Sequence, residues 1–129
     1  MVDIKKQHLF PYIEEYRQQF PITDGTIFVF DKTIYTNNEI PYDILHHELE
    51  HLRHQQEVTP KLWIDRYLKD KDFRLEAELR AYRLQLEKVK EQGDKEELFN
   101  ITDECANNLS SKLYGGIISK RSALKLLKE

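Results

Sequence analysis

The sequence predicts a mainly helical α+β domain with one small β-hairpin or sheet near its N-terminus. Residues 27–35 are rich in β-branched and aromatic side chains, which favour strands. From Pro41 almost to the C-terminus, residues that begin or end helices recur between amphipathic stretches. With 129 residues, of which 40% are hydrophobic and 33% charged, the chain can form one modest core, and we expect a single domain over residues 1–129.

The N-terminal third contains one predicted helix and the predicted hairpin. Apolar residues recur at roughly helical spacing from Ile4 to Phe20, interrupted or restarted at Pro11, so we expect helix there. The strands of the hairpin are expected at Ile27–Phe30 and Thr33–Tyr35, joined by a tight turn at residues 31–32.

The remainder is predicted to be helical. A helix from about Tyr42 to Gln56 follows Pro41, and Thr59-Pro60 is a typical N-cap followed by proline at the first helical position. Asp72 is expected to cap a long helix that ends near Gln92, where Gly93 stops it. Two more helices are expected, at about residues 95–113 and after Ser119.

Composition excludes several classes of protein. The net charge is −3, and lysine and arginine are interleaved with acidic residues, so we expect no nucleic-acid binding. No apolar run is long enough to cross a membrane, and the N-terminus does not resemble a signal peptide. The lone Cys105 cannot form an intramolecular disulfide, which suits a reducing compartment. We therefore expect a cytoplasmic protein.

The stretch YDILHHELEHLRHQQ, residues 42–56, contains four of the five histidines and the motif H-E-x-x-H. His47 and His51 lie four residues apart, so on a helix both side chains point the same way and can hold one metal ion. Imidazole nitrogen is a favoured ligand of Zn²⁺. Glu48 lies about 100° around the helix from His47, where a carboxylate can act as general base towards a zinc-bound water.

A catalytic zinc site needs a third protein ligand. Residue 57, where metzincins have a histidine, is Glu57. His54 shares the face of His47, but three ligands from one straight helix do not converge on a tetrahedron, so we assign it an outer or surface role. Glu76 and Glu78, on the predicted long helix, are the remaining candidates; they lie about 200° apart, so only one can face the histidines.

The two motifs together resemble zinc peptidases of the gluzincin type. In that group the third ligand is a glutamate on a later helix, often in the pattern E-x-x-A. Glu78, followed by Ala81, is similar to this pattern, whereas the residue three positions after Glu76 is Leu79. The resemblance therefore implies Glu78 as the third zinc ligand.

Three runs of sequence, HHELEHLRHQ, DFRLEAELRAYRLQ and LSSKLYGGIIS, resemble a family of small, mostly uncharacterised zincin-like proteins encoded by phages and prophages. The resemblance covers roughly residues 26–127. It implies a gluzincin-like core made of a hairpin, an active-site helix, a glutamate helix and a C-terminal helical cap. It also implies that the strand before the active-site helix, Thr33–Tyr35, is an edge on which an extended peptide substrate lies, unless that edge is covered.

Other residues have weaker predicted roles. Tyr82 and Tyr114 are candidates for stabilising an oxyanion, although packing alone would explain them. Asp103 could orient a ligand histidine. Trp63 and Tyr67 are expected in the core, and Cys105 is expected to be a small buried residue rather than a nucleophile.

The sequence thus predicts a zinc-dependent metallohydrolase, in particular a peptidase that acts on a protein or peptide substrate. His47, His51 and Glu78 are the predicted zinc ligands, and Glu48 is the predicted general base. The alternative is a zinc-stabilised interaction module without catalysis, which a phage-type protein would use to bind a partner. The sequence predicts no oligomeric state.

Overall fold

The computed structural model describes residues 2–129, which are mostly helical with one three-stranded sheet. This confirms the predicted α+β class. The strands are β1 (Asp3–Lys5), β2 (Phe28–Phe30) and β3 (Thr33–Tyr35). The helices are α1 (Ile13–Arg17), α2 (Tyr42–Val58), α3 (Pro60–Lys69), α4 (Lys71–Glu91), α5 (Lys95–Leu109) and α6 (Lys120–Lys128), with short 3-10 helices at Gln7–Leu9 and Lys112–Tyr114.

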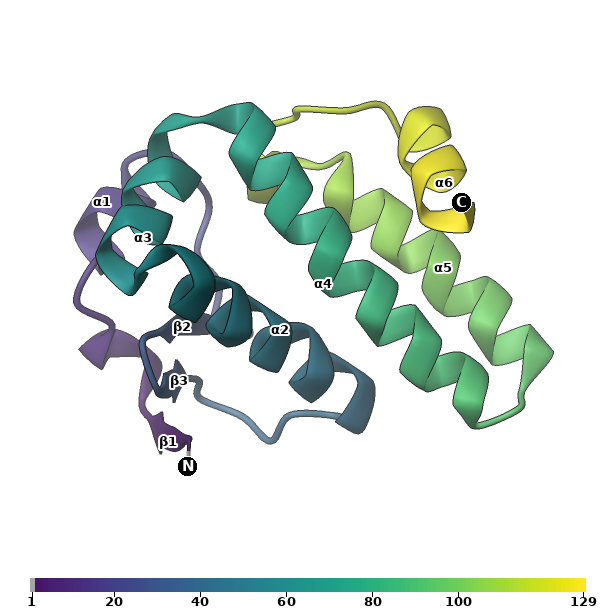
Figure 1. The fold of residues 1–129 in the computed structure, drawn as a ribbon, viewed down its shortest axis with the longest axis horizontal. Helices are drawn as coiled ribbons and strands as arrows, with labels where there is room; N and C mark the ends of the chain where they lie inside the picture. Colours follow the sequence, from purple (N-terminus) through teal and green to yellow (C-terminus); the bar gives the residue numbers. More distant parts are fainter. Residues whose placement is uncertain (1) are drawn as a thin grey trace.

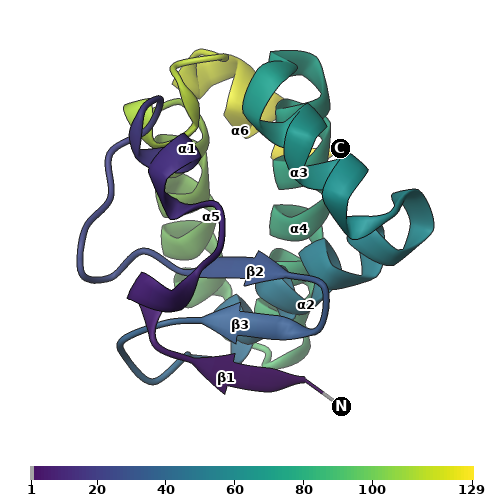
Figure 2. The same ribbon diagram turned by 90° about the vertical axis from the view of Figure 1, so that its left-hand side faces the viewer.

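The predicted hairpin is present, but its second strand is not an edge. β2 pairs antiparallel with β3, and β1 pairs parallel with the other side of β3, so that the order is β1-β3-β2 (Figure 2). The expectation that Thr33–Tyr35 offers a free edge to a substrate is therefore wrong. Its backbone groups on both sides are used by neighbouring strands, and β1 and β2 are the edges.

The predicted N-terminal helix is largely wrong. The segment from Ile4 to Phe20 contains β1, a 3-10 helix and only five residues of α-helix. Ile4 pairs with Ile34 in the sheet, and its side chain is 65% exposed. The parallel pairing satisfies the backbone of β1 through a strand about thirty residues away, which local apolar spacing cannot reveal.

The later helices follow the predicted signals with two corrections. Asp70, not Asp72, caps α4, because its side chain accepts hydrogen bonds from the backbone N–H of residues 72 and 73 at 3.0 and 3.2 Å. α5 ends at Leu109 rather than Leu113. Ser110 and Ser111 end it, since their hydroxyls donate to the carbonyls of Ala106 and Asn108.

Helix α2 lies between the sheet and α4, with α5 and α6 on the far side of α4 (Figure 1). Buried Gln55 fastens α2 to the hairpin: its Nε2 donates to the carbonyl of Val29 at 3.0 Å, and its Oε1 accepts from the N–H of Asp31 at 2.8 Å. No helix within residues 2–129 combines the length and apolar character needed to cross a membrane.

Candidate metal centre and pocket

The face that α2 turns towards α4 carries both motif histidines. His47 and His51 are 6% and 4% exposed, and their rings meet edge to face with centroids 4.8 Å apart. One helical turn separates them, as the four-residue spacing requires. Burying two imidazoles on the inner face of a helix is costly unless they find polar partners.

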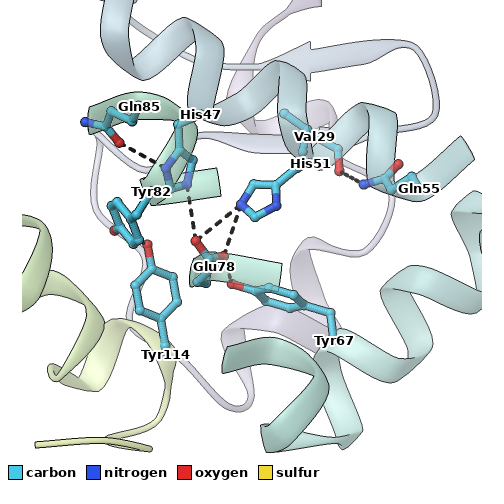
Figure 3. Close-up of polar contacts among 9 residues, drawn as sticks. All are labelled: Val29, His47, His51, Gln55, Tyr67, Glu78, Tyr82, Gln85 and Tyr114. Carbon is cyan, nitrogen blue, oxygen red and sulfur yellow. Dashed lines mark hydrogen bonds and ion pairs between the residues drawn. The ribbon is translucent and has the colours of Figure 1, made fainter. Parts of the chain in front are cut away.

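The polar partner of both histidines is Glu78 on α4, which is 2% exposed. The Nε2 atom of His47 lies 3.2 Å from Oε1 of Glu78, and Nε2 of His51 lies 3.2 Å from each carboxylate oxygen (Figure 3). One donor atom from each of the three residues lies within 4.8 Å of the others. The structure thus brings together the two histidines and the glutamate that the sequence nominated.

The second ring nitrogen of His47, Nδ1, is held by the side-chain amide of Gln85. Oε1 of Gln85 lies 3.0 Å from Nδ1 of His47, while Nε2 of Gln85 donates to Oδ2 of Asp43 at 2.9 Å. The carboxylate of Asp43 can only accept, so the amide presents its oxygen to the imidazole. With Nδ1 as the donor to Gln85, Nε2 of His47 donates to Glu78 only when the imidazole is protonated, and a bound cation would take the place of that proton.

Glu78 has no lysine or arginine partner within residues 2–129. Besides the histidines, Tyr67 donates a hydrogen bond to its Oε2 at 2.6 Å. Burial acts to raise the pKa of Glu78, but the charge and hydrogen bonds of His51 and His47 outweigh it and hold the pKa below its usual range. A buried, ionised carboxylate facing two imidazoles is a site that a cation would complete.

Glu48 is also buried, at 8% exposed, and its carboxyl group makes no hydrogen bond or ion pair with residues 2–129. Burial raises the pKa of Glu48 to about 7; the charge of Glu78 adds to this increase and His47 opposes it. A carboxyl group with this pKa exchanges its proton near neutrality, as a general acid or base must.

Glu48 and the three-residue cluster line a partly open pocket of about 520 Å³. Its aromatic wall includes four tyrosines, Tyr16, Tyr67, Tyr82 and Tyr114. The hydroxyls of Tyr82 and Tyr114 lie 2.6 Å apart (Figure 3). Burial, followed by the charge of Glu78, raises the pKa of both phenols well above the ordinary value, so both stay protonated and able to donate.

The other candidates lie elsewhere. Glu76 is exposed on a different face of α4. His54 is buried and stacks on Phe73, with centroids 5.5 Å apart, instead of joining the cluster. Asp103 pairs with Lys120 at 2.9 Å and therefore does not orient a histidine, contrary to that suggestion.

Cys105 is buried as expected. Burial first, with the charges of Glu104 and Asp43, raises the pKa of its thiol to about 12, so a nucleophilic thiolate is disfavoured. Trp63 and Tyr67 belong to the core as predicted, although the hydroxyl of Tyr67 also serves the cluster.

Sequence reasoning missed the roles of Gln85, Asp43 and the Tyr67 hydroxyl. A signal for two of them was available in the spacing. Gln85 follows Glu78 by seven residues and Asp43 precedes His47 by four, so each shares a helical face with a cluster residue. The role of Tyr67 depends on how α3 packs against α4 and has no signal of this kind.

The donor set fits a metal ion. Two imidazole nitrogens and a carboxylate oxygen are ligands that Zn²⁺ accepts, and three protein ligands leave one tetrahedral position open. A group that could hold a metal ion is therefore present. Comparisons with models of protein families, with curated proteins and with solved structures found no match. The gluzincin and phage-family resemblances remain predictions from the sequence.

Proposed function

We propose that this chain is a zinc-dependent hydrolase, and specifically a peptidase, with His47, His51 and Glu78 as ligands and Glu48 as general base. The observation that carries the proposal is the meeting of the three donors in a pocket that also contains the unpartnered carboxyl of Glu48. The H-E-x-x-H motif and the gluzincin-like glutamate pattern support it.

When bound, Zn²⁺ supplies Lewis-acid chemistry, since it polarises a carbonyl and makes water more acidic. The chain provides the rest. Glu48, which lines the same pocket as the three ligands, would accept a proton from the attacking water and deliver it to the leaving amine. Gln85 holds His47 in the tautomer that frees its Nε2.

The tyrosine pair is placed to stabilise developing negative charge. One hydroxyl of Tyr82 and Tyr114 donates to the other, which leaves the proton of the second free to point at a substrate oxygen. Both line the pocket alongside Glu48 and the cluster.

Substitution of Glu48 by glutamine tests the chemical role. Zinc-loaded wild-type protein is expected to cleave casein or another unfolded protein, with products identified by mass spectrometry. Glu48→Gln should lower turnover at least about 100-fold, because the general base is lost. Its zinc content should match wild type. Glu76→Gln, an exposed glutamate outside the pocket, is the control and should retain full activity.

A second candidate is a zinc-stabilised interaction module. It is favoured by the burial of the cluster between α2 and α4, where an ion would tie two core helices together. If the zinc-loaded wild type cleaves nothing, or if Glu48→Gln matches it in every assay, the hydrolase proposal fails and this candidate replaces it.

A further inference from the structure

The lining of the pocket is acidic. The acidic residues that line it are Asp43, Glu48, Glu78 and Glu104, and none of its described lining residues is lysine or arginine. A bound divalent cation would offset two of these charges. The lining would then remain negative, since no lysine or arginine among its described residues balances the remaining carboxylates.

The nearest buried cation is already engaged. The guanidinium of Arg74 donates to the carbonyl of Tyr67 at 2.6 Å and to the carbonyl of Tyr114 at 2.9 Å, and it lies 4.8 Å from the ring centroid of Phe20. Arg74 does not line the pocket. It is therefore not placed to receive an anionic group of a ligand.

Asp43 and Glu104 are the lining carboxylates other than Glu78 and Glu48. They come from the first turn of α2 and from α5, and the charge of each raises the pKa of the Cys105 thiol, which also lines the pocket. Asp43 accepts one hydrogen bond from Gln85, and neither carboxylate has an ion-pair partner in the described chain. Glu104 is exposed, so a ligand can reach it.

Two further features indicate that this space receives a ligand. Glu48, nine-tenths buried, lines the pocket with no partner in residues 2–129. The lining also includes phenylalanine, tyrosine and tryptophan side chains, and aromatic faces attract cations such as ammonium and guanidinium groups. The acidic residues and the aromatic side chains of the lining therefore both favour a ligand with ammonium or guanidinium groups.

We propose that this pocket takes basic or uncharged segments of a polypeptide and rejects carboxylates. The proposal rests on the peptidase function and specifies its substrates. A free C-terminal carboxylate finds no cation to bind it, so cleavage occurs inside a chain and not one residue from its C-terminus. Lysine or arginine near the cleaved bond is preferred to aspartate or glutamate.

Binding of peptide hydroxamates tests the preference for basic over acidic side chains without requiring turnover. Three N-acetylated hydroxamates that differ in one side chain, lysine, norleucine or glutamate, are titrated into the zinc-loaded protein. Trp63, the single tryptophan and a lining residue, reports binding by its fluorescence. The lysine compound is expected to bind at least about tenfold more tightly than the glutamate compound, with a smaller difference at high salt.

Removing the charge of Glu104 tests whether this residue contributes to the preference for lysine. Glu104→Gln should shrink the ratio of lysine to glutamate affinity by about threefold or more, since Glu104 makes no contact that its loss would disturb. Glu96→Gln, on the same helix but outside the pocket, should leave the ratio unchanged.

Equal affinities of the lysine and glutamate compounds, or a preference for the glutamate compound, would overturn the proposal. A protein that binds the lysine compound as expected but cleaves no peptide would instead contradict the peptidase function. The two failures are therefore distinguishable.

Discussion

At the scale of single residues, Gln85 is the side chain on which the orientation of His47 depends. Its amide bridges Asp43 and His47 with hydrogen bonds of 2.9 and 3.0 Å. Gln85→Met keeps the volume but removes both bonds, so the imidazole of His47 is no longer held in one tautomer. Loss of such an outer partner typically weakens metal binding about 10- to 100-fold.

Competition with a chromophoric zinc chelator measures this loss. Gln92→Met, at the exposed C-terminal end of the same helix, is the matched control and should bind zinc as wild type does. Equal zinc affinity of Gln85→Met and wild type would show that the amide does not orient His47.

The cluster residues were predictable because the motif is local. Helical spacing alone places His47 and His51 on one face, whereas Glu78 needed the resemblance to a known pattern to be preferred over Glu76. The polar partners were not predicted. A glutamine or tyrosine on a helix carries no mark of its partner until the packing of α2, α3 and α4 is known.

At the scale of elements, an ion-pair network outside the candidate pocket clamps α2 to α4. Arg80 donates to buried Glu50 at 2.6 Å and also binds Glu57, while Arg53 pairs with Glu50 at 2.5 Å. Arg80→Met leaves the charge of Glu50 poorly compensated. We expect the free energy of unfolding to fall by about 2 kcal/mol, less than for a fully buried pair because Arg80 is partly exposed.

Urea unfolding of the metal-free protein measures that change. Arg83→Met, also on α4, removes only an exposed hydrogen bond to the carbonyl of Leu126 and should cost well under about 1 kcal/mol. Similar losses in the two variants would contradict a specific clamp.

The junction of α2 and α3 stores backbone strain at Thr59. Its φ is 132°, in a region that favours glycine, and its hydroxyl accepts a hydrogen bond of 3.4 Å from the N–H of Leu62. Thr59→Gly relieves the strain at little capping cost and should stabilise the protein by about 1 kcal/mol. Thr59→Ala keeps the strain and loses the cap, so it should destabilise by about 0.5–1 kcal/mol.

Thermal unfolding of both variants tests whether Thr59→Gly stabilises the protein and Thr59→Ala destabilises it. If both variants changed the stability in the same direction, either the backbone of Thr59 would not be strained or its hydroxyl would not stabilise α3 as a cap.

Helix boundaries were predictable where caps and prolines mark them, as at Thr59-Pro60 and Ser119. The N-terminal strand was not, because β1 exists only through its parallel pairing with β3. The central position of β3 was missed for the same reason. A sequence pattern specifies a strand but not which strands flank it.

At the scale of the whole molecule, the pocket joins residues from Phe10 to Tyr114, so its formation requires the complete fold of that span. Zinc that binds only the folded chain should therefore stabilise it, by about 2.7 kcal/mol when free zinc is 100 times the Kd. Urea unfolding with and without zinc measures the gain. A zinc-independent midpoint would indicate that the ion does not bind the native cluster.

The most direct test of the metal centre is a crystal structure of the zinc-loaded protein with anomalous scattering recorded at the zinc absorption edge. We expect one peak per chain, about 2.0–2.2 Å from Nε2 of His47, Nε2 of His51 and a carboxylate oxygen of Glu78. A chain with no peak, or with zinc bound away from these three side chains, would contradict the account.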